Sequence, residues 1–110
     1  MISIENIREA AMNYDFCTID EMYQSDPEAF RKCLDVMVKD TNDVTRKQVV
    51  IIASAYELDK YLDILINDED MFIRNSLARI APIKYLKILL NDSRSLVRET
   101  ASSTLKRRTE

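Results

Sequence analysis

A nine-residue segment occurs twice in this chain. Residues 60–68 read K-Y-L-D-I-L-I-N-D and residues 84–92 read K-Y-L-K-I-L-L-N-D, so that seven of nine positions are identical. An Arg follows the last Asp by six residues in both copies, at Arg74 and Arg98. Repeats of this period are typical of proteins built from stacked units, because one unit is too small to bury its apolar face alone. The repeat therefore restricts the architecture, but it specifies no chemistry.

A third and more divergent copy precedes these two at an offset of 28 residues. Its matching positions include Lys32, Leu34, Asp40, Arg46 and Ala53. The three copies cover residues 32–107, and the four extra residues follow Ala53. Because the Asp-to-Arg spacing is six residues in every copy, we expect the same pair of helices in each.

The chain contains no glycine and only two prolines. Hairpin turns and phosphate-binding loops depend on glycine, which enters positive φ freely, so the composition favours an all-helical fold and excludes Rossmann and P-loop sites. We expect Asn67 and Asn91 to replace glycine where the first helix of a repeat ends.

Capping residues and apolar spacing predict the individual helices. Ser3 is expected to cap the first helix, Thr18 and Glu21 to form a capping box, and Asp26 to cap a helix that starts at Pro27. The predicted helices are residues 4–13, 19–24, 27–40, 43–55, 58–66, 71–81, 83–90 and 95–107.

Two of these helices carry specific expectations about burial. The apolar run 49–53 would suit a strand in isolation, but it aligns with the amphipathic run 77–81, so we expect a helix that is buried on most sides. In the last helix we expect Leu96, Val97, Ala101 and Leu105 to be buried. Its other side is polar, as a terminal repeat requires, at Ser95, Glu99, Ser102, Ser103 and Lys106.

The repeat pattern resembles a known family. The pattern L-x-x-L-x-x-D-x-x-x-x-V-R-x-x-A, which resembles HEAT-like repeats, is found at Leu86, Leu89, Asp92, Val97, Arg98 and Ala101. The 24-residue period and Pro82 are also similar to the leucine-rich repeat variant, whose units alternate α and 3₁₀ helices. The resemblance covers about residues 30–107. It implies a right-handed, all-α solenoid of about three short repeats over residues 26–110, preceded by an N-terminal helical cap over residues 1–25, in a single domain.

The repeated Asp and Arg residues are expected to be structural. An Asp in the turn can accept free N–H groups of the second helix, and an Arg six residues later can bind the carbonyls or carboxylate of an adjacent turn. Recurrence in every unit indicates a scaffold role for Asp40, Asp68, Asp92, Arg46, Arg74 and Arg98.

Charge is unevenly distributed along the chain, whose net charge is −3. Residues 1–43 carry 10 acidic and 4 basic side chains, whereas residues 79–110 carry 8 basic and 3 acidic ones. Such asymmetry can orient a partner, and the alternative is that basic residues only complement a helix dipole. The candidate partner-binding residues are Arg79, Arg94, Lys106, Arg107 and Arg108.

No residue pattern predicts catalysis, a metal site or a cofactor. The chain has no histidine, and its two cysteines, Cys17 and Cys33, are too few for a zinc site, so we expect reduced, partly buried thiols. No signal segment or membrane span is recognisable, which makes the cytoplasm the expected location.

The leading hypothesis is a small, non-enzymatic helical-repeat module that binds a protein partner as an adaptor, regulator or inhibitor. The alternative is nucleic-acid binding through the basic C-terminal side. A sequence pI of about 5.0 and few aromatic residues weigh against the alternative. A third possibility is a module that works only as an oligomer, and the sequence leaves its oligomeric state open.

Overall fold

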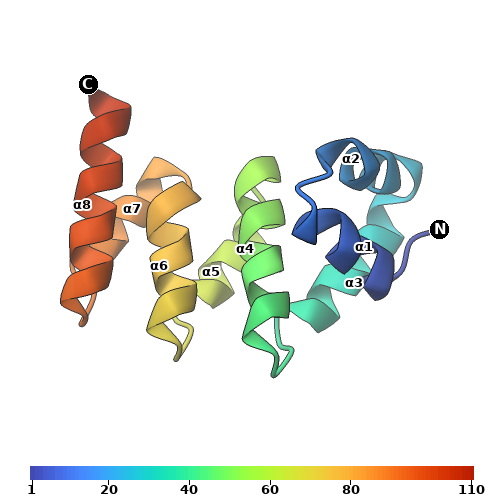
Figure 1. Ribbon diagram of the computed structural model, residues 1–110, viewed down its shortest axis with the longest axis horizontal. Coiled ribbons are helices and arrows are strands. Elements are labelled where there is room, and N and C mark those ends of the chain that lie inside the picture. The colour runs from blue at the N-terminus through green and yellow to red at the C-terminus, as the bar shows by residue number, and fades with distance from the viewer. The chain divides into compact units, whose positions relative to one another are not determined.

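The computed structural model describes all 110 residues, and it contains eight α-helices and no strand (Figure 1). The all-helical prediction is therefore confirmed. The helices are α1 (Ile4–Met12), α2 (Phe16–Ser25), α3 (Pro27–Met37), α4 (Asp43–Tyr56), α5 (Asp59–Leu65), α6 (Met71–Ile80), α7 (Ile83–Leu89) and α8 (Ser95–Thr109). The short helices α5 and α7 are α-helices rather than the 3₁₀ helices that the leucine-rich repeat variant implies. No helix has the length and apolarity needed to cross a membrane.

The chain divides into two compact units, Met1–Val49 and Val50–Glu110, and the boundary falls within α4. We call them the N-terminal unit and the C-terminal unit. In the N-terminal unit, helices α1, α2 and α3 contact one another. The division into a cap over residues 1–25 and repeats over residues 26–110 stays a prediction.

Side-chain caps start the helices of the N-terminal unit. The Ser3 hydroxyl accepts a hydrogen bond from Asn6 N, and the Asp26 carboxylate accepts one from Ala29 N ahead of Pro27, as predicted. The predicted capping box of Thr18 is wrong, because α2 starts three residues earlier.

The residue that caps α2 is Asp15. Its carboxylate accepts hydrogen bonds from both Thr18 N (3.1 Å) and the Thr18 hydroxyl (2.6 Å). Because the charged acceptor satisfies two donors at once, it takes the capping position from the hydroxyl of Thr18.

The apolar run in α4 is helical and buried, as its alignment with the later repeats predicted. Val49, Val50, Ile52 and Ala53 have no exposed surface, and Ile51 is half-buried. Their β-branched side chains are tolerated in a helix because burial outweighs a small loss of propensity.

Two helices end at a left-handed residue that is not glycine. Tyr14 (φ 51°) follows α1 and Glu57 (φ 53°) follows α4, and both adopt the left-handed conformation. In each case the next amide reaches back across the helix end, from Asp15 N to Ala10 O and from Leu58 N to Ala53 O. The prediction that Asn67 and Asn91 play this role is wrong, since neither has positive φ.

The C-terminal unit contains two equivalent helix pairs, α5 with α6 and α7 with α8. Helices α5 and α7 have the same length and lie 24 residues apart, in agreement with the sequence repeat. Equivalent side chains form the core, and the buried pairs are Tyr61 and Tyr85, Leu62 and Leu86, and Leu65 and Leu89. Helix α8 packs against both α6 and α7, and α6 and α8 run side by side (Figure 1).

Candidate functional site

The turn between the two helices of a repeat has the same hydrogen bonds in every copy. An Asp carboxylate accepts from the backbone N–H two residues later, at Asp40, Asp68 and Asp92. The Asp therefore shapes the turn, and the prediction that it accepts the free N–H groups of the following helix is wrong. In the middle copy that role belongs to Asp70, whose carboxylate accepts from Phe72 N.

The repeated Arg binds the carbonyls of this turn, as predicted. The Nη1 atom donates to the carbonyl of the Asp six residues earlier, at 2.8 Å from Arg46, 2.7 Å from Arg74 and 2.8 Å from Arg98. One nitrogen of each guanidinium is thus fixed by its own repeat. A guanidinium has further nitrogens that can donate to a second group.

In Arg74 those nitrogens bind the next repeat. Arg74 Nε donates to Asp92 Oδ2 at 2.8 Å, and Nη2 donates to Asp92 Oδ1 at 3.2 Å. Only 12% of the Arg74 side chain and 6% of the Asp92 side chain are exposed. This shielded, two-point ion pair joins α6 to the turn before α8.

The pair shifts the pKa values of both partners. Burial alone would raise the pKa of Asp92, but hydrogen bonds from Arg74 and from Arg94 N, with the charge of Arg74, lower it below its ordinary value of 3.8. The hydrogen bond to Asp92 raises the pKa of Arg74. Both side chains are therefore charged throughout the physiological pH range.

A second connection joins α7 to α5. Tyr85 Oη donates to Asp63 Oδ1 at 2.7 Å, and Lys84 Nζ lies 2.5 Å from Asp59 Oδ2. Burial, with the hydrogen bond to Asp63, raises the pKa of Tyr85, and the ion pair lowers the pKa of Asp59. Tyr85, Lys84 and Asp63 belong to the repeated segment, and these contacts give their side chains a structural role.

Arg98 differs from Arg74 although it has the same anchor. Its Nη1 binds the Asp92 carbonyl, and its side chain is exposed at the start of α8. No carboxylate contacts its Nε and Nη2 atoms. The edge of the guanidinium that binds Asp92 in Arg74 is therefore open to solvent in Arg98.

The structure places four of the five predicted basic residues at the two ends of α8. Arg94 is the N-cap residue of α8, whereas Lys106, Arg107 and Arg108 lie in its last turn. At 1.5 Å per residue, about 20 Å of helix separates the two ends. Arg79 is in the last turn of α6, beside the C-terminal group.

Arg108 binds backbone carbonyls of another helix, which neither Lys106 nor Arg107 does. Its Nη1 donates to the carbonyl of Ala81, the C-cap residue of α6, and its Nη2 lies 3.5 Å from the Arg79 carbonyl. A guanidinium there satisfies free carbonyls at the helix end and complements the helix dipole. Arg107 makes one weak contact, 3.4 Å to the Thr104 hydroxyl.

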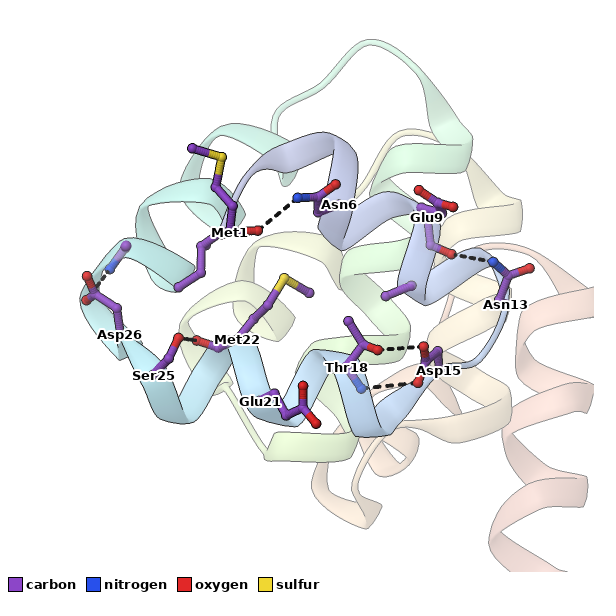
Figure 2. Close-up of a pocket in the computed structure, with 13 residues that line it drawn as sticks. Met1, Asn6, Glu9, Asn13, Asp15, Thr18, Glu21, Met22, Ser25 and Asp26 are labelled. Atoms are coloured by element: carbon purple, nitrogen blue, oxygen red, sulfur yellow. Dashed lines mark hydrogen bonds between the residues drawn. The ribbon is translucent and has the colours of Figure 1, made fainter.

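The N-terminal unit contains a pocket of about 830 Å³ between α1, α2 and the start of α3 (Figure 2). Four carboxylates line it, from Glu9, Asp15, Glu21 and Asp26, and no Lys or Arg side chain does. Figure 2 shows that Asp15 is bonded to Thr18, and these bonds lower its pKa. Two of the four carboxylates, those of Asp15 and Asp26, cap helices and therefore have a structural role.

No group of His, Cys, Asp and Glu side chains is arranged to hold a metal ion. Both cysteines are free, and Cys33 is half-buried as expected, whereas Cys17 is exposed. Burial raises the pKa of the Cys33 thiol, which disfavours the reactive thiolate.

Large apolar side chains are exposed at equivalent positions of the two C-terminal repeats. Ile64 (42% exposed) is equivalent to Ile88 (57%), and Phe72 (53%) is equivalent to Leu96 (40%). Leu96 was expected to be buried, and this expectation is wrong. The exposed positions Val36 and Val44 correspond to them in the first copy of the repeat.

Sequence reasoning missed both this recurrence and the open edge of Arg98. A comparison of the copies position by position for outward-facing apolar residues would have found the first. The second depends on how α6 packs against the turn before α8, which the sequence does not display. No protein-family model, curated protein or solved structure matches this chain, so the geometry of its own residues carries the functional argument.

Proposed function

We propose that this protein is a non-enzymatic interaction module that binds a protein partner, and that its helix pairs form a HEAT-like, right-handed solenoid. The 24-residue spacing of the two pairs α5–α6 and α7–α8 supports the repeat architecture, as does the Arg74–Asp92 connection between them. A solenoid presents equivalent side chains in rows, which suits it to binding an extended surface.

The observation that carries the proposal is the recurrence of exposed apolar side chains. Ile64 and Ile88, and likewise Phe72 and Leu96, occupy matching positions and are 40–57% exposed. A single exposed apolar residue needs no explanation, but an exposed row repeated with the period of the fold indicates a contact surface for apolar groups of another protein.

The charge of the same unit indicates the chemistry of the partner. Basic side chains occupy both ends of α8, at Arg94 and at Lys106–Arg108. An acidic polypeptide that also carries apolar side chains complements both features. Phosphate groups of a nucleic acid would bind the basic side chains but would leave the exposed apolar side chains uncovered.

The test is capture of partners from an extract of the source organism with immobilised wild-type protein and with the double variants Ile64→Ser/Ile88→Ser and Phe72→Ser/Leu96→Ser. Ile80→Ser is the matched control, because Ile80 is 41% exposed but its repeat equivalent, Thr104, is buried and polar. Circular dichroism should show the same helix content in all variants.

We expect the wild type and Ile80→Ser to retain the same defined protein, with and without nuclease, and each double variant to lose it. Loss of every bound protein after nuclease treatment would instead assign the surface to nucleic acid. Equal retention by the double variants would show that the apolar row is not the contact surface.

A further inference from the structure

Arg98 is held in the same way as a residue that already binds a carboxylate in this protein. Arg74 and Arg98 occupy equivalent positions, and each Nη1 is anchored on the Asp carbonyl six residues earlier, at 2.7 and 2.8 Å. Arg74 uses its Nε and Nη2 atoms to bind both oxygens of Asp92. The same atoms of Arg98 have no such partner, and its side chain is exposed.

We propose that Arg98 binds an Asp or Glu carboxylate of the protein partner through Nε and Nη2, in the two-point geometry that Arg74 makes with Asp92. The inference rests on the proposed function and names a specificity-determining contact within it. The planar guanidinium presents two parallel donors that match the two oxygens of a carboxylate.

The anchor prepares Arg98 for this contact. A free Arg side chain must lose rotamer freedom when it binds, and this loss opposes association. In Arg98 the hydrogen bond from Nη1 to the Asp92 carbonyl already restricts the guanidinium. Arg94 lies four residues earlier at the start of the same helix and adds a second exposed positive charge.

The surface around Arg98 favours an acidic segment over another stacked helix pair. Three positions on α6, Met71, Asn75 and Ala78, are half-buried or buried. Their equivalents on α8 are Ser95, Glu99 and Ser102, and all three are exposed and polar, as the sequence predicted. Ser95, Glu99 and Ser102 offer no apolar area that would favour the burial of another helix, whereas polar surroundings with one oriented guanidinium suit a hydrated carboxylate.

The test follows the Nε–Hε signal of Arg98 by ¹⁵N NMR in the full-length protein while a peptide of twelve Asp residues is added. The signal is assigned by its absence from Arg98→Lys, which keeps the charge but lacks the paired donors. Arg107→Lys is the matched control, because Arg107 is exposed on the same helix and contacts only Thr104.

We expect the Asp peptide to shift the Arg98 signal, Arg98→Lys to weaken binding about tenfold, and Arg107→Lys to weaken it less than about twofold. A twelve-residue Asn peptide should not bind. Equal weakening in the two Lys variants would show only diffuse attraction and overturn the proposal. Tighter, Arg98-dependent binding of a twelve-nucleotide oligo(dT) would overturn it in favour of phosphate.

A capture experiment with the same variants separates this inference from the proposed function. Loss of the captured partner from Arg98→Lys but not from Arg107→Lys supports the inference. Full retention by Arg98→Lys overturns the inference and leaves the proposed function standing. If the wild type captures no protein, the proposed function fails, and with it the assignment of the carboxylate to a protein.

Discussion

Arg74 on α6 and Asp92 in the turn before α8 form a two-point ion pair, with Nε–Oδ2 at 2.8 Å and Nη2–Oδ1 at 3.2 Å. The same guanidinium binds the Asp68 carbonyl of its own repeat at 2.7 Å. One side chain therefore holds its own turn and the next one at the same time. The bond between the Arg and its own turn is present in all three copies, which explains why the Asp-to-Arg spacing is identical in every copy.

Replacement of Arg74 by Ala should lower the free energy of unfolding by about 1.5 to 3 kcal/mol, because hydrogen bonds to charged groups are lost and Asp92 stays shielded without its partner. Arg98→Ala is the control, since it removes the equivalent residue where only one exposed bond is made, and it should cost less than about 1 kcal/mol. Urea unfolding followed by circular dichroism measures both. Equal losses in the two variants would contradict the structural role of the ion pair.

Replacement of Asp92 by Asn should change stability in a pH-dependent way. The pKa of Asp92 is lower in the folded protein than its ordinary value of 3.8, so its ionisation stabilises the fold above that pH, and the contribution is lost as the pH falls through the folded pKa. The difference in unfolding free energy between wild type and Asp92→Asn should be constant from about pH 7 to 5 and should narrow below about pH 4. A difference that stays constant down to pH 2 would show that the charge of Asp92 is not involved.

Replacement of Glu57 by Gly should stabilise the protein. Glu57 has φ 53°, and the left-handed conformation costs a residue with a Cβ about 1 to 2 kcal/mol, of which the flexibility of glycine in the unfolded chain offsets part. We expect a net gain of about 0.5 to 1 kcal/mol in thermal or urea unfolding. Glu57→Ala keeps the Cβ and should give no such gain, so an equal gain from Ala would assign the effect to the lost charge instead.

Most of the fold could be predicted from the sequence, because the repeat and the spacing of apolar and capping residues predict the same helices. The bounds of the four helices in residues 58–109 were predicted to within about two residues, since each copy supports the other. The errors arose where two local solutions compete. Asp15 takes the capping position that Thr18 could also fill, and the Asp68 carboxylate shapes a turn for which the sequence predicted a left-handed Asn67.

The candidate site was less predictable because its contacts link residues far apart in the chain. The bond from Arg74 to its own turn follows from a six-residue spacing, but its pairing with Asp92 spans 18 residues and depends on how the helices pack. The same holds for Arg108, which sequence reasoning grouped with Lys106 and Arg107 as one basic surface. Packing gives these three adjacent residues different roles.

The last prediction separates these roles. Arg108→Ala should lower the free energy of unfolding by about 0.5 to 1.5 kcal/mol, because the carbonyl of Ala81 loses its donor at the end of α6. Lys106→Glu/Arg107→Glu should leave stability almost unchanged, since exposed charges contribute less than about 1 kcal/mol each. The double variant should instead change the rate of association with an acidic partner.

Association is measured by stopped-flow fluorescence with a labelled peptide of twelve Asp residues. Charges steer encounter over a Debye length of about 8 Å at physiological salt, so the double reversal should slow binding at low salt, and the difference from wild type should fade as salt is added. Arg108→Ala should slow binding less, because one charge is removed instead of two being reversed. Unchanged association rates in the double variant at low salt would mean that Lys106 and Arg107 only complement the dipole of α8, and the contact surface would then lie at Arg94 and Arg98, at the other end of the helix.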